Sequence, residues 1–496
     1  MKKLPALGLL SLIAFSTLNA EAIKTQKSAF RTSFESVKIS DDEDMGLVGI
    51  AYLFEPNDYF YYGLNVYGTL SGKRGGFFTG GLNTGFKYPL YEKLYLDSGI
   101  FVGAGGGGSA PQGGGLMLKA YLGALYQFDN YSLGLNYSRV KFPNGDIDSS
   151  GLSIVADVKF DTLFVESDLT SKDFSNYHFA NSKDYFTPTL QYYIPKDGTK
   201  KTNGSALDEN IGLIGIEYGA YISDNVLAYF ESAGAFSGDS TGYMEVLGGL
   251  GYSLPLAKST DIQAKVSLGS AGGGQINTGG GAVSKASLNL NYNPTKNINA
   301  GFALGTYHAF EGDFDATTAR VNIGINTNFL SLSKSKSSIK PSSIKTQKFN
   351  VRVAHQSYLA SDTLRADSNE EAVHLIGFKL DYFLTENFYA SGQASTAYSG
   401  KAGGYMAGMF GLGYVQPLLK DLSLVGEFNF GASGGGGLKS GNGMTIQPMA
   451  GLRYNITKKV SVELLYGRIM ALSENSMDTD MLDIAFVYRF DKLSLK

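Results

Sequence analysis

The strongest constraint on the fold is a two-residue alternation of apolar and polar side chains along almost the whole chain. One stretch, for example, interleaves Leu152, Ile154, Ala156, Val158 and Phe160 with Ser153, Asp157 and Lys159. Successive side chains of a β-strand point to opposite faces, so the pattern predicts strands with one apolar face and one small or polar face. Strands of about ten residues are long enough to cross a bilayer at a tilt.

The first 22 residues have the three parts of a secretory signal peptide. Lys2 and Lys3 precede an apolar stretch from Leu4 to Leu18, and the small residues Ala20 and Ala22 flank an expected cleavage site. After residue 22 no apolar run approaches the ~18 residues that a membrane-spanning helix needs. The sequence therefore predicts an exported protein whose membrane residence, if any, depends on strands.

The mature chain contains three tandem repeats. A Pro-Leu pair recurs at positions 89, 255 and 417, and a glycine run follows each pair, at residues 105–108, 272–274 and 434–437. The segment Ile-Lys-Thr-Gln-Lys occurs at residues 23–27 and again at 344–348. We predict repeat 1 at 23–166, a junction at 167–184, repeat 2 at 185–332, a Ser/Lys-rich linker at 333–347 and repeat 3 at 348–496.

Each repeat is expected to contain about eight antiparallel strands, with connections that alternate in length. In the third repeat the connections at 359–371, 399–404, 431–443 and 473–480 are longer, whereas those at 385–387, 417–421 and 457–458 are short. Outer-membrane barrels have this asymmetry, with short periplasmic turns and longer extracellular loops. We therefore predict an all-β, antiparallel, up-and-down transmembrane β-barrel.

The signal peptide, the alternating strands, the abundance of Tyr and Phe, and a last strand that ends Ala485-Phe486-Val487-Tyr488-Arg489-Phe490 resemble a Gram-negative outer-membrane β-barrel protein. The chain departs from the usual ending by adding residues 491–496 after Phe490. The resemblance implies location in the cell outer membrane and contact with its lipid and lipopolysaccharide. It also implies handling by periplasmic chaperones and the barrel assembly machinery.

Three repeats of eight strands allow two architectures. One barrel of about 24 strands forms if residues 152–160 pair with residues 185–194, and three eight-stranded barrels form if residues 152–160 pair back onto residues 30–34. Long junctions and large inward side chains such as Tyr61, Tyr67 and Phe101 favour three small barrels. A single chain more commonly builds a single barrel, and we favour one barrel.

Composition excludes several classes of function. The chain has no cysteine, so it has no disulfide, thiolate metal site or cysteine nucleophile, and a net charge of −3 argues against a nucleic-acid partner. The glycines at 105–115 join two predicted antiparallel strands and open no helix, so they do not predict a phosphate site. His178, His308, His355 and His374 show no metal-ligand spacing, and His355-Gln356-Ser357 is too weak a motif to indicate a lipid hydrolase. We expect no enzyme activity, no catalytic or metal site and no cofactor.

Charged residues on the polar face of the strands are expected to point into the barrel, because a charge that faces lipid is costly. The candidates that would line the lumen are Lys87, Asp97, Lys119, Asp157, Lys159, Lys265, Glu427, Arg453, Glu463 and Arg489. They are equally compatible with a lined passage and with structural ion pairs. We predict a channel or transport protein that passes small polar solutes or assists export. The alternative is a non-catalytic structural anchor or surface-display protein with filled barrels, and the oligomeric state stays open.

Overall fold

The computed structural model describes residues 23–40, 43–165, 174, 177–333, 339–365 and 371–496. The predicted signal peptide lies outside these residues, as do parts of both predicted junctions. Within them the only helical element is a single 3-10 turn, η1 (Pro341–Ser343), and everything else regular is strand. No helix among the described residues is long and apolar enough to cross a membrane.

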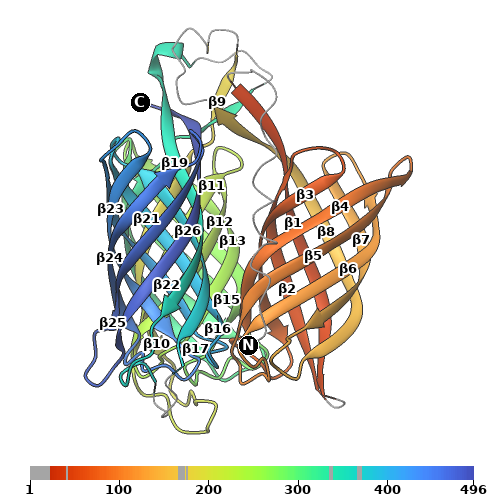
Figure 1. Ribbon diagram of the computed structural model, residues 1–496, viewed down its shortest axis with the longest axis vertical. Coiled ribbons are helices and arrows are strands. Elements are labelled where there is room, and N and C mark those ends of the chain that lie inside the picture. Colours follow the sequence, from red (N-terminus) through yellow and green to blue (C-terminus); the bar gives the residue numbers. More distant parts are fainter. Residues whose placement is uncertain (1–22, 41–42, 166–173, 175–176, 334–338, 366–370) are drawn as a thin grey trace.

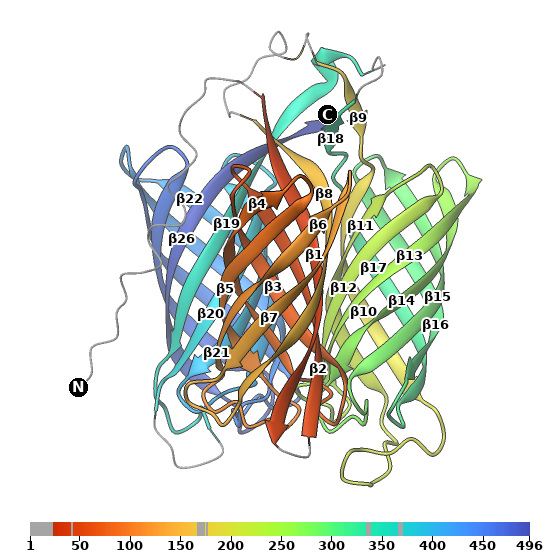
Figure 2. The same ribbon diagram turned by 90° about the vertical axis from the view of Figure 1, so that its right-hand side faces the viewer.

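The strands form three closed eight-stranded antiparallel barrels, seen side by side in Figures 1 and 2. Barrel 1 consists of β1 (Ile23–Ser40), β2 (Glu43–Glu55), β3 (Phe60–Ser71), β4 (Phe78–Tyr91), β5 (Leu94–Gly106), β6 (Leu116–Gln127), β7 (Tyr131–Lys141) and β8 (Asp148–Val165). Barrel 2 consists of β10 (Asp184–Pro195), β11 (Ile211–Tyr221), β12 (Val226–Ser237), β13 (Met244–Ala257), β14 (Thr260–Gly272), β15 (Ala282–Thr295), β16 (Ile298–Ala309) and β17 (Asp315–Asn326). Barrel 3 consists of β19 (Ile344–Tyr358), β20 (Val373–Phe383), β21 (Phe388–Ser399), β22 (Met406–Pro417), β23 (Leu422–Gly434), β24 (Met444–Asn455), β25 (Val460–Ala471) and β26 (Asp478–Leu495).

The favoured prediction of one barrel of about 24 strands is wrong. Strand β8 pairs back onto β1, with Val158 opposite Phe30 and Ile154 opposite Phe34, and β17 and β26 close their barrels in the same way onto β10 and β19. Eight strands enclose a space that side chains alone can fill, and the inward side chains here are large enough to fill it. Tyr61, Tyr67 and Phe101 are all buried in this space.

The connections fall at two distinct ends of the barrels. We call the end with the longer loops, such as 72–77, 107–115 and 142–147, the loop end, and the opposite end with the short turns the turn end. Residues 400–405 and 435–443 lie at the loop end and residues 418–421 at the turn end, as the alternation of connection lengths predicted.

The outer wall of all three barrels is apolar. Leucine, isoleucine and valine at alternate positions are half or more exposed, for example Leu122, Ile154, Val266, Leu288 and Leu412. Their immediate neighbours in the sequence point inward. An exposed apolar belt around a closed barrel is the surface that a transmembrane barrel presents to lipid.

At the turn end, barrels 1 and 3 and the segments just before and after barrel 2 meet in an apolar cluster that we call the junction cluster. It contains Ile23, Leu163, Val165, Phe174, Phe179, Leu330, Ile344 and Leu493. Beside it, two short strands, β9 (Phe179–Asn181) and β18 (Leu330–Leu332), pair with each other just before and just after barrel 2. The residues after Phe490 have their place here: they extend β26 as far as Leu495, and Asp491 bridges to Val165 of barrel 1.

Candidate functional site

Most of the residues predicted to line the lumen lie inside the barrels. Each barrel interior has two layers of side chains, one apolar and one charged. At the loop end each interior is filled by a cluster of buried apolar and aromatic side chains, which we call the plug. Towards the turn end lies a network of buried charged side chains. Both layers follow from the inward parity of the strands, because residues i and i+2 share one face of a strand.

The plugs draw on both strands and loops. In barrel 1 the plug includes Tyr67, Phe101 and Met117 from strands, and Phe142 and Ile147 from the loop between β7 and β8. The plug of barrel 2 is mainly aromatic, with Tyr193, Tyr243, Tyr307 and Phe314. Barrel 3 is filled chiefly by Tyr358, Tyr405, Leu375 and several methionines. Loops thus fold into the mouths of the barrels.

In barrel 1 the charge network is built around Arg31 of β1. Its guanidinium donates to Asp157 at 2.7 Å and to Asp97 at 3.0 Å, and Tyr61 donates to Asp97 at 2.7 Å. Lys119 pairs with Glu35 at 2.5 Å on the side of the plug. Each of these side chains is at least nine-tenths buried, so the charges neutralise one another inside the barrel.

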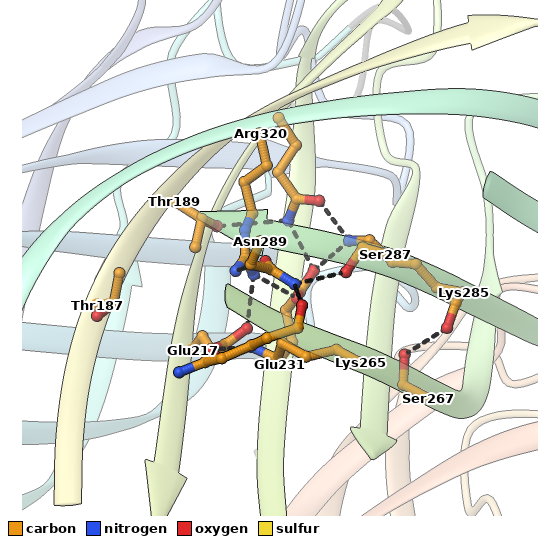
Figure 3. A network of polar contacts seen from close by, with 12 residues as sticks. Thr187, Thr189, Glu217, Glu231, Lys265, Ser267, Lys285, Ser287, Asn289 and Arg320 are labelled. Atoms are coloured by element: carbon orange, nitrogen blue, oxygen red, sulfur yellow. Dashed lines mark hydrogen bonds and ion pairs between the residues drawn. The ribbon is translucent and has the colours of Figure 1, made fainter. Parts of the chain in front are cut away.

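Barrel 2 has an equivalent network from different strands, shown in Figure 3. Arg320 of β17 contacts Glu217 at 2.6 Å and Glu231 at 3.2 Å. Lys265 pairs with Glu217 at 2.5 Å, and Lys285 pairs with Glu231 at 2.6 Å. Figure 3 shows these side chains extending from several strands into one region of the interior. The side chains therefore occupy that region.

Barrel 3 places Arg352 of β19 among three carboxylates. The guanidinium lies 2.7 Å from Asp381, 2.6 Å from Glu427 and 2.8 Å from Glu463. Arg453 also pairs with Glu463, and Lys379 pairs with Asp483 at 2.8 Å. Arg352 and its three carboxylate partners have fully buried side chains.

Eight of the ten candidate lumen residues are buried in these interiors, and Lys159 and Arg489 are half-buried nearer the turn end. The eight are Lys87, Asp97, Lys119, Asp157, Lys265, Glu427, Arg453 and Glu463. Three central residues were missed, namely Arg31, Arg320 and Arg352. A signal was available for two of them, because Arg320 lies between Ala319 and Val321 and Arg352 lies between Val351 and Val353, in the alternation of apolar and polar residues.

The glycine-rich loops contact the neighbouring barrel. The β3–β4 loop of barrel 1 meets the β14–β15 loop of barrel 2, where the Gly75 N–H donates to the Gly279 carbonyl at 3.0 Å. The β12–β13 loop of barrel 2 meets the β23–β24 loop of barrel 3, with the Thr241 hydroxyl donating to the Gly441 carbonyl at 2.5 Å. The β21–β22 loop of barrel 3 meets the β5–β6 loop of barrel 1, where the Gln112 amide donates to the Gly403 carbonyl at 3.1 Å.

These three contacts form a closed ring, because each barrel offers its second loop-end hairpin to the third loop-end hairpin of the next barrel. The close approach requires glycine: a Cβ on Gly434 would lie 2.5 Å from the Gly242 nitrogen across the interface, and one on Gly76 would lie 2.3 Å from the Gly273 nitrogen. The ring has the head-to-tail geometry of a cyclic trimer, built within one chain.

Two of the four histidines lie apart and two lie together. His178 is exposed in the segment before barrel 2, where its carbonyl accepts from the Ser333 N–H at 2.8 Å. His308 contacts Asp315 at 2.8 Å on the surface. His355 and His374, which the sequence treats as unrelated, both contact Ser357 at 3.0 Å on the outer wall of barrel 3. Among the described residues no group of three or more His, Asp or Glu side chains could hold a metal ion.

No protein-family model and no curated protein matches the sequence. Among solved structures, the chain is similar to the crystal structures of Pseudomonas aeruginosa OpdQ (9% identity, 94% of this chain and 99% of that chain covered, TM-score 0.23) and Acinetobacter baumannii OccAB3 (10% identity, 94% and 99% covered, TM-score 0.23). It is also similar to the siderophore receptor PirA from Pseudomonas aeruginosa (8% identity, 94% and 80% covered, TM-score 0.28). At such TM-scores the backbones do not superpose as whole folds, and the architecture rests on the strand pairing itself. By that pairing and its exposed apolar wall, the chain has the fold of a transmembrane β-barrel protein.

Proposed function

We propose that the protein is a non-conducting structural protein of the outer membrane, in which three filled barrels anchor one continuous platform of loops. The filled interior is the observation that carries this proposal. Each barrel is occupied by a plug at its loop end and by paired charges below it. A solute would have to displace both layers, whereas an anchor requires that they stay in place.

The ring of loop contacts supports the same function. Three barrels held at both ends, by glycine-rich loops at one end and by the junction cluster at the other, form a broad rigid body rather than three tethered ones. We propose that the loop end faces the cell exterior, where it would meet lipopolysaccharide, and that the apolar wall contacts membrane lipid. Assembly would use the periplasmic chaperones and barrel assembly machinery that serve such proteins.

Planar-bilayer recording of the refolded full chain tests the proposal against the channel that the sequence favoured. We expect no stable open level after insertion, because buried plug side chains occupy the loop end of each interior. The double variant Tyr307→Ala/Phe314→Ala, which shortens two plug side chains of barrel 2, provides a comparison in which leakage through that barrel should rise. A stable open level in the unaltered protein would reject the anchor function and support transport.

A further inference from the structure

The outer wall of barrel 3 carries a chain of hydrogen bonds that the proposed function does not use. The Ser357 hydroxyl lies 3.0 Å from Nε2 of His355 and 3.0 Å from Nδ1 of His374. The Tyr398 hydroxyl lies 3.0 Å from Nδ1 of His355. All three distances are compatible with one proton arrangement, in which His374 donates to Ser357, Ser357 donates to Nε2 of His355, and Nδ1 of His355 donates to Tyr398.

This group lies on the outer wall at the loop end. Ser357 is the second-last residue of β19, His374 is the second residue of β20, and Tyr398 is the second-last residue of β21. The two histidines and Tyr398 are half-buried, and Ser357 is 8% exposed. The group thus lies where the apolar belt gives way to the loops.

The fold does not require polar side chains at this corner. Strand register aligns His355 with Phe34 in barrel 1 and Leu190 in barrel 2, both of which are 45–47% exposed. The same register aligns His374 with Gly46 and Gly212. Tyr398 likewise aligns with Leu70 and Phe236, one residue before the serine that ends each strand. Only barrel 3 has two imidazoles around a hydroxyl here.

We infer that Ser357 is a nucleophile for acyl transfer, with His355 as its general base and Tyr398 as the residue that positions the base. A hydroxyl within hydrogen-bond reach of an imidazole, which is in turn oriented by a third group, is the arrangement that activates serine. The group lies on the outward face of β19, β20 and β21, near the seam where β20 and β21 approach β5 of barrel 1.

The chemistry that fits is hydrolysis of a carboxylic ester. Oγ of Ser357 bonds to the ester carbonyl carbon while its proton passes to Nε2 of His355. The carbon–oxygen bond to the alcohol then breaks, the alcohol leaves with the proton from His355, and the acyl group stays on Ser357. Water attacks the acyl-serine, gives a proton to His355 and releases the carboxylic acid, and Ser357 recovers its proton. The overall reaction converts the ester and one water molecule into the alcohol and the carboxylic acid, and it needs no other co-reactant.

The substrate class follows from the site's depth. The acyl esters of membrane lipids lie at the boundary between hydrocarbon and headgroups, and strands that span the hydrocarbon end near that boundary. The group stands at the ends of β19, β20 and β21. Phospholipid and lipopolysaccharide share this ester chemistry. The substrate assignment rests on the proposed membrane location, whereas the assignment of the nucleophile does not.

Covalent labelling of the full chain in detergent with a fluorophosphonate probe tests the nucleophile. We expect one labelled residue, Ser357, and complete loss of label in Ser357→Ala. His355→Phe, which installs the residue found at the aligned position of barrel 1, should slow labelling by about 10²–10⁴-fold because the base is lost. Ser36→Ala removes the aligned serine of barrel 1 and should leave labelling unchanged. Absence of label on Ser357, or labelling that His355→Phe leaves unchanged, would overturn the inference.

Two further experiments test the role of Tyr398 and the source of the ester. Tyr398→Phe should preserve the fold and move the pH profile of labelling, because the partner of Nδ1 is lost. An unmoved profile would remove Tyr398 from the site. Release of fatty acid from phospholipid vesicles, compared with release from vesicles containing lipopolysaccharide, tells the two sources apart. If neither lipid yields acid while Ser357 still labels, the assignment of a membrane ester is rejected and only the nucleophile stands.

Discussion

Arg352 illustrates how a single residue can determine whether a barrel interior is stable. Its guanidinium faces Asp381, Glu427 and Glu463 at 2.6–2.8 Å, and none of these groups reaches solvent. If the arginine is removed, the three carboxylates stay buried without a compensating positive charge. The free-energy cost of these unpaired charges typically exceeds the net contribution of the ion pair to stability. The same logic applies to Arg31 and Arg320 in the other barrels.

We therefore predict that Arg352→Met lowers the free energy of unfolding by about 3–5 kcal/mol. Arg139→Met is the matched control, because Arg139 also pairs with an aspartate but is 61% exposed, and exposed pairs contribute little. Chemical denaturation in detergent, followed by the change in gel mobility on heating, measures both. Equal losses in the two variants would mean that barrel 3 is open to water.

The sequence could predict which residues enter the interior but not how they pair there. Alternation assigns Glu427 and Arg453 inward by simple parity, and both are buried. The pairing of Arg352 with residues on β20, β23 and β25 depends on barrel closure, which parity does not reveal. The same limit applies to Ser357. His374 is 17 residues away in the sequence, and His355, two residues away, forms no recognisable motif with it.

At the scale of strands and loops, the glycine runs act at the interfaces between barrels. Loop flexibility is the simplest explanation from sequence, but the loops are closely packed in the structure. Gly434 ends β23 against the Gly242 backbone of barrel 2, whereas Gly426 on the same strand has no atom within 4 Å of where a Cβ would lie. The two glycines therefore provide a matched pair.

We predict that Gly434→Ala weakens the docking of barrel 3 on barrel 2 by about 1–3 kcal/mol, because the added methyl group overpacks the interface. Gly426→Ala should have no such effect. Cysteines placed at Thr241 and at Asn442, the residue after Gly441, in a chain that has none of its own, report docking through the rate at which a short bifunctional reagent cross-links them. A rate that Gly434→Ala leaves unchanged would show that this contact does not hold the barrels together.

The apolar wall gives a second prediction at this scale. Leu288→Arg should destabilise the membrane-inserted protein by about 2–4 kcal/mol, because Leu288 is 64% exposed on the outer wall of β15. Asn203→Arg, in the exposed loop after β10, is the control and should cost almost nothing. Unfolding in lipid vesicles checks both. No difference between them would mean that this wall does not face lipid.

At the scale of the whole molecule, closure into three barrels makes each repeat self-sufficient in hydrogen bonding. A closed barrel has no unpaired strand edge. An unpaired edge would expose backbone N–H and C=O groups without hydrogen bonds to the lipid hydrocarbon, which is energetically costly. The sequence predicted antiparallel strands and a barrel, but it could not distinguish one ring of strands from three. That choice depends on whether β8 reaches β1 or β10, and both strands have a compatible pattern.

We predict that residues 23–165 expressed alone fold into a monomeric barrel whose gel mobility changes on heating. Thirteen residue pairs join β1 to β8, so the isolated repeat keeps its full strand pairing. Circular dichroism and gel mobility in detergent measure the outcome. A fragment that aggregates, while the full chain refolds under the same conditions, would contradict independent closure.

The ring of glycine-rich contacts also has an evolutionary consequence. A trimer of identical subunits must accept any substitution three times over, once in each copy. Here the contacts that close the ring involve mainly backbone groups of the loops, and the three barrels are encoded separately, so a change in one wall leaves the other two as they were. One barrel could thus acquire the Ser357 group while its neighbours kept the apolar corner that the membrane favours.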